Sequence, residues 1–266
     1  DDELSRYQAT LIVPKCAISN KTPVPLIVSG HGGPHSSCIN SHTQSGAAFL
    51  TSGMAVLYIN YRGSLGFGQD SLETLPGRAG FQDVAEVLQA TQWALQKAAP
   101  SLLNKERVGY VGGSHGGFLG AHLSVIPGTP IKRTALRNPV INVASMVNVT
   151  DIPEWAFCEA GVAPICAATG LALTADPSAL EKMWRVSPVA RVRKGGQHPG
   201  PTLLFVGGSD MRVPPAQSVE WMRLITEAYG PGIVTMRWYK DSGHAIDEVP
   251  NGDDVWVHTL EFFKQL

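Results

Sequence analysis

The sequence predicts a doubly wound α/β domain, in which a mostly parallel sheet carries helices on both faces. Short apolar runs alternate with longer amphipathic segments along the 266 residues. Most of these runs stop at glycine, as strands that are buried on both faces of a parallel sheet require. The regular alternation of strands and helices favours a single α/β domain over residues 1–266.

The individual elements follow from hydrophobic periodicity. The expected strands are residues 25–29, 55–60, 107–111, 202–206 and 234–239. The expected helices are residues 81–97, 215–228 and 253–265. Their inward faces should carry Val84, Leu88, Thr91 and Leu95 in the first helix, Val219, Met222 and Ile225 or Thr226 in the second, and Val255, Leu260 and Phe263 in the third. Residues 150–200 break this rhythm, and we expect irregular helices there that contribute to a substrate pocket.

The charge balance argues against two classes of partner. The chain has 21 basic and 22 acidic residues and a formal net charge of −1, so no nucleic-acid partner is expected. The acidic opening lacks the pattern of a signal peptide. The most apolar stretch, residues 161–175, is too short to span a bilayer, and no membrane partner is expected. We interpret this stretch as an insertion or cap segment.

The four cysteines show neither CxxC nor zinc-site spacing. In a domain of this size they are expected to be reduced thiols, mostly packed in the interior of an intracellular protein. A disulfide between Cys158 and Cys166 is the alternative.

A nucleophile is indicated by Gly112-Gly113-Ser114-His115-Gly116, a Gly-x-Ser-x-Gly sequence. The motif follows an expected strand and precedes a helical segment, and this context distinguishes a nucleophile turn from a chance match. The sharp turn exposes the serine hydroxyl at the carboxyl end of the sheet, and the glycines remove Cβ atoms that would collide across the turn. A phosphate-binding loop is excluded because no lysine follows the glycines. The sequence therefore predicts an α/β-hydrolase fold with Ser114 as nucleophile.

The acid and base should follow the nucleophile in the order Ser, Asp, His. Asp210 comes directly after the strand at 202–206, and His244 lies between the last strand and the last helix. His244 would take the proton of Ser114, and Asp210 would hold the imidazole in the correct tautomer. Because the base must start neutral, activity should fall in acid.

Other acids and histidines fit these positions less well. Asp241, three residues before His244, is the alternative acid. Asp151 and Asp176 lie in the irregular region, His258 lies inside the last helix, and His198 precedes a strand.

The turn His31-Gly32-Gly33-Pro34-His35 follows the first strand. Glycine in such a turn lets a backbone amide approach the substrate, so the N–H groups of Gly33 and His115 are the expected oxyanion donors. A metal site at His31 and His35 is rejected because Gly-Gly-Pro cannot form the helix that would place both on one face. No metal or other cofactor is expected. Residues 63–68 depart from the dinucleotide-binding pattern and are interpreted as a loop beside the site.

Several blocks of sequence are similar to those of a known enzyme family. The blocks are residues 31–37, 60–64, 66–70, 112–118, 137–142 and 212–214. Together they resemble the catalytic domain of the acylaminoacyl-peptidase branch of the prolyl oligopeptidase family, and the resemblance runs from about Val24 to the end of the chain. The N-terminal β-propeller of that family has no counterpart in the 266 residues.

The resemblance implies a serine peptidase that releases an N-acylated, for example N-acetylated, amino acid from short blocked peptides in the cytoplasm. It implies the same catalytic residues, Ser114, Asp210 and His244, and the same amides, Gly33 and His115. It is compatible with a homo-oligomer. Two alternatives stay open, namely a broader esterase or a dipeptidyl- or oligopeptidase on the same scaffold, and a catalytically silent binding protein.

Overall fold

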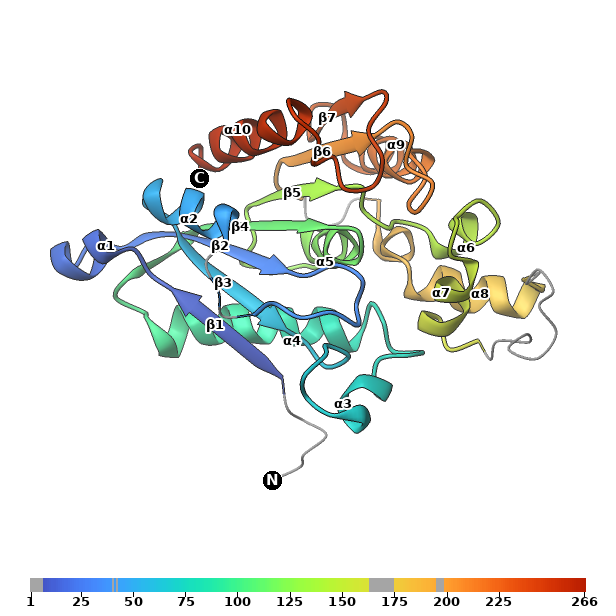
Figure 1. The fold of residues 1–266 in the computed structure, drawn as a ribbon, viewed down its shortest axis with the longest axis horizontal. Coiled ribbons are helices and arrows are strands. Elements are labelled where there is room, and N and C mark those ends of the chain that lie inside the picture. The colour runs from blue at the N-terminus through green and yellow to red at the C-terminus, as the bar shows by residue number, and fades with distance from the viewer. Residues whose placement is uncertain (1–6, 40, 42, 163–174, 195–198) are drawn as a thin grey trace.

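The computed structural model describes residues 7–39, 41, 43–162, 175–194 and 199–266. Seven strands form one sheet in the order β1-β3-β2-β4-β5-β6-β7. The strands are β1 (Gln8–Ile12), β2 (Val24–Gly30), β3 (Ala55–Asn60), β4 (Leu103–Gly113), β5 (Arg133–Arg137), β6 (Thr202–Gly207) and β7 (Val234–Tyr239). Only β1 runs antiparallel to its neighbour, and the other pairs are parallel. The doubly wound, mostly parallel sheet is therefore confirmed (Figure 1).

All five predicted strands are present, and two of them, β3 and β7, have the predicted bounds. Two further strands, β1 and β5, were not predicted. β1 lies at the edge of the sheet and pairs only with β3, so it needs no continuous apolar run. β5 is only five residues long and has arginine at both ends. Its apolar run is therefore too short to be recognised in the sequence, although the centre of the strand is fully buried.

Ten α-helices connect and cover these strands in the part of the chain that the structure describes. They are α1 (Lys15–Asn20), α2 (Gln44–Thr51), α3 (Gln69–Glu73), α4 (Gln82–Trp93), α5 (His115–Ser124), α6 (Val143–Met146), α7 (Pro153–Glu159), α8 (Pro177–Val186), α9 (Ala216–Tyr229) and α10 (Asn251–Phe263). A π-helical turn, Ala94–Ala98, extends α4. A 3₁₀ turn, Pro188–Arg191, follows α8.

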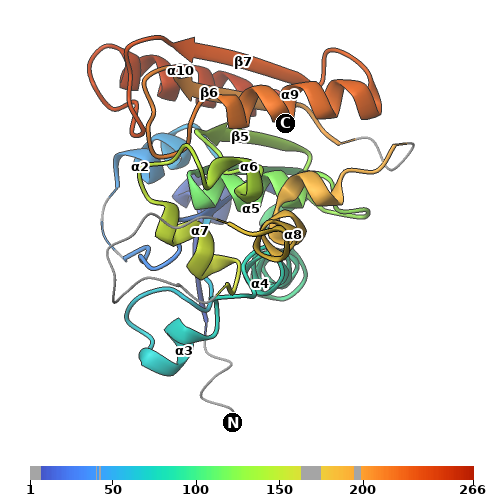
Figure 2. The same ribbon diagram turned by 90° about the vertical axis from the view of Figure 1, so that its right-hand side faces the viewer.

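The sheet has a core on each face, as expected for a doubly wound domain. On one face, side chains of α4, α5 and α9 pack against β2, β3, β4, β5 and β6, and buried residues of α8 join the same cluster. On the other, α2 and α10 cover the sheet through Phe49, Val255 and Phe263 (Figure 2). The parallel strands end at one edge of the sheet, and the loops that follow them meet there.

The buried stripes of three helices differ from those predicted. In α4, Val84 and Thr91 are buried as expected, but Leu88 is only partly buried, as is Leu95 in the π-helical turn that follows. Val87 and Ala90 are buried in their place. Asp83 and Glu86 are buried as well, because they are held by polar contacts that periodicity does not reveal.

The other two helices show smaller shifts. α9 buries Trp221 and Ile225, while Val219 and Met222 are only partly buried. The buried face of α9 is centred on Trp221, because the indole ring buries more apolar surface than the other side chains of the helix. α10 buries Val255 and Phe263 as predicted, with Thr259 rather than Leu260 between them.

Three cysteines are described, and all are free thiols. Cys16 and Cys158 are exposed, so the expectation that the cysteines are mostly packed in the interior is wrong for these two. Cys166, the partner in the alternative disulfide, lies outside the described residues, as does most of the apolar stretch 161–175. Within the described ranges, no helix combines the length and the apolar character that a bilayer crossing needs.

Candidate active site

Ser114 stands at the sharp turn that the sequence predicts. β4 ends at Gly113 and α5 begins at His115, leaving Ser114 with φ 57° and ψ −123°. Positive φ is strained for any residue with a Cβ and persists only where the surroundings enforce it. Such strain is typical of a nucleophile held on a strand-to-helix turn.

The flanking glycines are required by the packing of this turn. A Cβ on Gly112 would lie 2.4 Å from the carbonyl oxygen of Gly116. A Cβ on Gly116 would lie 2.3 Å from the carbonyl oxygen of Gly30, at the end of β2. Both contacts are with backbone, which cannot move aside, so glycine is needed on each side of Ser114.

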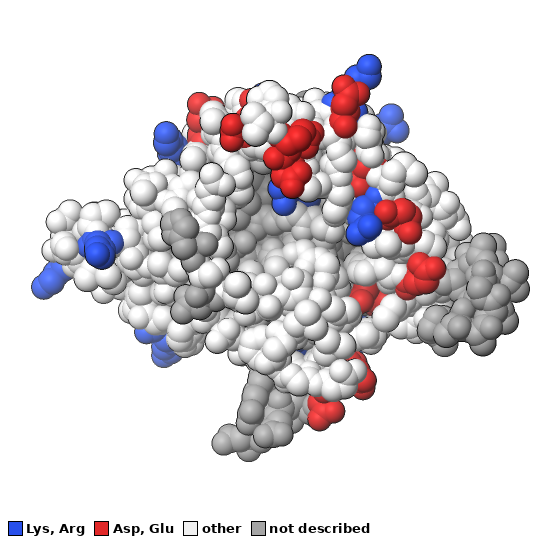
Figure 3. Space-filling view, viewed as in Figure 1, with Lys and Arg blue, Asp and Glu red and all other residues white. Residues whose placement is uncertain are grey.

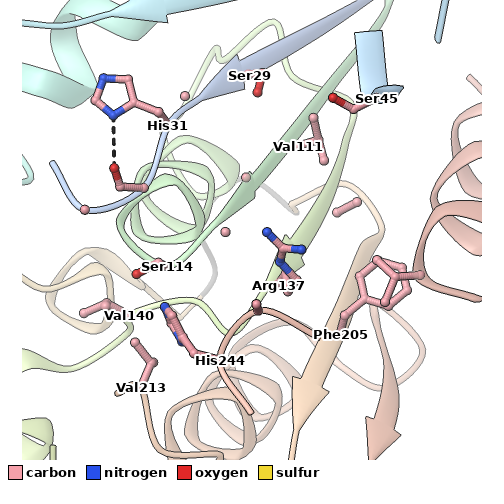
Figure 4. Close-up of a pocket in the computed structure, with 18 of the residues that line it drawn as sticks. Ser29, His31, Ser45, Val111, Ser114, Arg137, Val140, Phe205, Val213 and His244 are labelled. Atoms are coloured by element: carbon pink, nitrogen blue, oxygen red, sulfur yellow. Dashed lines mark hydrogen bonds between the residues drawn. The ribbon is translucent and has the colours of Figure 1, made fainter. Parts of the chain in front are cut away.

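The predicted acid and base are in contact. The Nδ1 atom of His244 lies 2.7 Å from Oδ2 of Asp210, whose side chain is fully buried. The other carboxylate oxygen accepts the N–H groups of Arg212 and Val213, at 2.8 and 3.0 Å. Because Asp210 occupies Nδ1, the Nε2 atom of His244 is left to face the cavity that Ser114 also lines (Figure 4).

The alternative acid takes no part in this contact. Asp241 is exposed, and in the described part of the chain the carboxylate within 4 Å of the His244 ring is that of Asp210. Asp151 pairs with Arg212 at 2.7 Å instead.

The remaining candidates have structural partners elsewhere. Asp176 caps α8 by accepting the N–H of Ala179 at 2.8 Å. His258 contacts Asp254 within α10. His198 lies outside the described residues.

Asn138 is a site residue that the residue-by-residue reasoning missed. It follows β5 with φ 41°, a left-handed conformation that asparagine tolerates better than most residues. Its Oδ1 accepts the N–H of Gly207 at 2.9 Å, and its Nδ2 donates to the carbonyl of His244 at 2.9 Å. One side chain thus joins the end of β6, where the Asp210 turn begins, to the loop of the base. The available signal was an asparagine directly after a strand.

The glycine turn after β2 packs against the Ser114 turn. A Cβ on Gly32 would lie 3.0 Å from the carbonyl oxygen of Gly113 and 3.3 Å from the Cβ of Ser114. Gly33 has φ 54°, in the left-handed region that favours glycine. His115 is the first residue of α5, so its N–H has no partner within the helix. Both N–H groups predicted to receive an oxyanion therefore belong to segments that meet at Ser114.

The two histidines of this turn are held by protein groups. His31 contacts the Ser64 hydroxyl through Nε2 at 2.7 Å and stacks on Tyr61, with ring centroids 4.5 Å apart. His35 contacts the carbonyl of Gly63 at 2.8 Å and Glu159 at 3.0 Å, and the bond to Glu159 raises the pKa of His35. The loop at 63–68 thus lies beside the site, as predicted. Over the described ranges, no group of three or more His, Cys, Asp or Glu side chains is arranged to hold a metal ion.

The stability of this turn should depend on pH through His31. Burial lowers the pKa of His31 from 6.5 to about 4, so between these values the unfolded chain binds a proton that the folded chain does not. The free energy of unfolding should therefore decrease as the pH falls through this window.

We expect His31→Asn to remove that component. The loss of stability between about pH 7 and about pH 5, measured by urea unfolding, should be smaller in the variant by on the order of 1 kcal/mol. An identical decrease in both proteins would contradict the lowered pKa.

A buried pair beneath Ser114 was not anticipated. The His115 ring is buried, and its Nε2 lies 2.8 Å from Oδ2 of Asp83, whose side chain is fully buried. Asp83 Oδ1 also accepts the N–H groups of Gly80 and Val84, each at 2.8 Å. Asp83 thus anchors the side chain of the residue next to Ser114.

A cavity of about 540 Å³ opens at this edge of the sheet, and Ser114 and His244 line it. Figure 3 shows the face hollowed near its middle, with walls mainly of residues other than Lys, Arg, Asp and Glu. The predicted pocket contribution of residues 150–200 is confirmed for Ile152 and Trp155, which line the same cavity.

Comparison with known proteins agrees with this geometry. The sequence model of the prolyl oligopeptidase family matches residues 41–266. The acylamino-acid-releasing enzyme of Rattus norvegicus is 38% identical over 259 residues, covering 95% of this chain and 34% of the relative. That of Homo sapiens is 38% identical over 258 residues, covering 97% and 33%. The chain thus spans about a third of the length of these relatives.

Solved structures show the same fold at lower identity. An acylaminoacyl peptidase of Pyrococcus horikoshii superposes with a TM-score of 0.81 at 21% identity, covering 97% of this chain and 39% of that one. The dipeptidyl peptidase 4 of Porphyromonas gingivalis superposes with a TM-score of 0.78 at 16% identity, covering 97% and 33%. The fold is therefore that of the α/β-hydrolases. By its match over residues 41–266, the chain belongs to the prolyl oligopeptidase family of serine peptidases.

Proposed function

We propose that this chain is the catalytic domain of an enzyme that releases an N-acylated amino acid from the N-terminus of short blocked peptides. Ser114 is the nucleophile, His244 the general base and Asp210 the residue that orients it. The observation that carries the proposal is the 2.7 Å contact between His244 and Asp210 in a cavity that the strained Ser114 also lines.

Acylation would begin with attack of Ser114 Oγ on the scissile carbonyl carbon while its proton passes to Nε2 of His244. The carbonyl oxygen becomes an oxyanion, which the N–H groups of Gly33 and His115 receive. When the C–N bond breaks, His244 gives its proton to the leaving amine, and an ester on Ser114 remains.

Deacylation repeats these steps with water. His244 takes a proton from a water molecule as the water oxygen attacks the ester carbon. The C–O bond to Ser114 then breaks, and His244 returns the proton to Ser114 Oγ. The N-acylated amino acid leaves with a new carboxylate. The buried Asp210 stabilises the imidazolium that forms in both halves of the cycle.

The substrate class is supported by relatives named acylamino-acid-releasing enzymes, which match 95–97% of this chain. Because the chain spans about a third of their length, the size limit on peptides and a homo-oligomeric assembly are proposed only for a protein of the relatives' full length. We propose a cytoplasmic location with it, as the family resemblance of the sequence blocks implies.

The substrate class is tested by assaying an acetyl-alanyl anilide beside a free-amino dipeptidyl anilide. We expect kcat/KM to favour the acetylated substrate by at least about tenfold, because a site built for an acyl group leaves an ammonium unpaired. A preference for the free amine would contradict the substrate class. Covalent labelling by a fluorophosphonate, lost in Ser114→Ala, tests the nucleophile itself. Absence of labelling in folded wild-type protein would favour a catalytically silent binding protein.

A further inference from the structure

The side chain of Arg137 lines the cavity beside Ser114. It is the last residue of β5, with Gly113 and Phe205 as its register partners on the neighbouring strands. A Cβ on Gly113 would lie 3.3 Å from Nε and 3.4 Å from Nη2 of Arg137. The guanidinium therefore lies against the residue that precedes Ser114, and the absence of a side chain at Gly113 leaves room for this close approach.

This guanidinium has no partner in the described part of the chain. Arg62, Arg212 and Arg237 each form an ion pair with a carboxylate, whereas neither a hydrogen bond nor an ion pair is formed by the side chain of Arg137. Burial lowers the pKa of Arg137, and the field of Asp247, which is exposed, only partly opposes this. A half-buried cation without a partner costs free energy, so the fold gains nothing from placing it here.

The cavity around Arg137 is lined mainly by apolar groups. Beyond Ser114 and His244 it extends along the sheet face covered by α2 and α10, between Phe49, Val111, Phe205 and Trp256. Figure 4 shows Arg137 directed into this space, between Val111 and Phe205. A charge in such surroundings attracts a counter-ion more strongly than it would in water. Because a guanidinium presents paired donors in a fixed fork, a carboxylate is the group that fits it.

We propose that Arg137 is a specificity-determining residue that binds a carboxylate of the ligand held in this cavity. The proposal rests on the proposed function, since the ligand is then a short N-acylated peptide. Such a peptide offers a carboxylate from two sources: the free C-terminus of the peptide, or the acidic side chain of the acylated residue.

The two sources are separated by matched substrate pairs. One pair is acetyl-Ala-Ala with a free C-terminus and the same peptide as its amide, and the other is acetyl-Glu anilide and acetyl-Gln anilide. In one pair, Arg137→Gln should reduce the ratio of kcat/KM for the charged over the neutral member about ten- to hundredfold, the range expected for a charge-assisted hydrogen bond. The pair that responds identifies the source, and Arg137→Lys should restore part of the ratio.

The matched control is Arg133→Gln, on the same strand, where the guanidinium lies over the ring of Phe262 rather than in the cavity. It should leave both ratios unchanged. Arg137→Gln should melt at the same temperature as Arg133→Gln or higher, because it breaks no ion pair. If neither ratio changes while acetyl-alanyl anilide is still hydrolysed, the role of Arg137 is refuted and the proposed function stands. Failure of the wild type to hydrolyse that neutral anilide would refute the proposed function instead.

Discussion

Replacing Asp210 by Asn should lower kcat about 10⁴-fold and leave the protein folded. The amide oxygen of Asn can still accept the N–H groups of Arg212 and Val213, so the turn after β6 keeps its shape. The amide NH₂, however, donates where the carboxylate accepted a hydrogen bond from the Nδ1–H group of His244. This favours the tautomer that carries its proton on Nε2, which cannot take the proton of Ser114.

Asp241→Asn is the matched control, since this residue is the nearest rival in sequence and is exposed. It should leave kcat within about twofold, because its contribution is that of a solvated surface charge. Single-turnover kinetics with an acetyl-alanyl ester would measure both variants, and melting curves would verify folding. Equal losses in the two variants would show that the contact between His244 and Asp210 is not the one that supports catalysis.

Those features of the site that depend on where strands end were predictable from the sequence. Ser114, Asp210 and His244 each follow an apolar run, and a parallel sheet brings the carboxyl ends of its strands to one edge. The Ser114 turn was readable because its Gly-x-Ser-x-Gly pattern is contiguous in the sequence, although Gly116 must also avoid the carbonyl oxygen of the distant Gly30.

Contacts between distant segments were not predictable in the same way. The side chain of Asn138 reaches residues 69 and 106 positions away, and Asp83 reaches His115 across 32. A single polar residue carries no periodic signal, so its partner becomes visible only after the strands have been ordered. Asp83 also occupies the first turn of a helix, where a solvated acid is the common case.

Arg137 illustrates a further limit. Arginine at both ends of β5 conceals the strand from a search for apolar runs, and the strand order is needed to place Arg137 beside Gly113. Its lack of a partner can be seen only once the surroundings of the side chain are known. The residues that were hardest to predict from the sequence are thus those whose side chains lie between neighbouring strand ends.

Asp83→Ala should therefore destabilise the protein by about 3–5 kcal/mol, although this residue lies outside the predicted set. The substitution leaves the buried ring of His115 and the N–H groups of Gly80 and Val84 without their acceptor, and each such donor costs about 1–3 kcal/mol. Because His115 supplies a proposed oxyanion amide, kcat should also fall in whatever protein remains folded.

Asp253→Ala supplies the matched control for Asp83, since Asp253 is likewise an acid in the first turn of a helix, but it is exposed. It should cost less than about 1 kcal/mol, the value of a charge near a helix N-terminus. Urea unfolding followed by tryptophan fluorescence would measure both variants. Because the two differ in burial and partners rather than in helix position, equal stabilities would mean that the contact between Asp83 and His115 contributes no more than a surface charge.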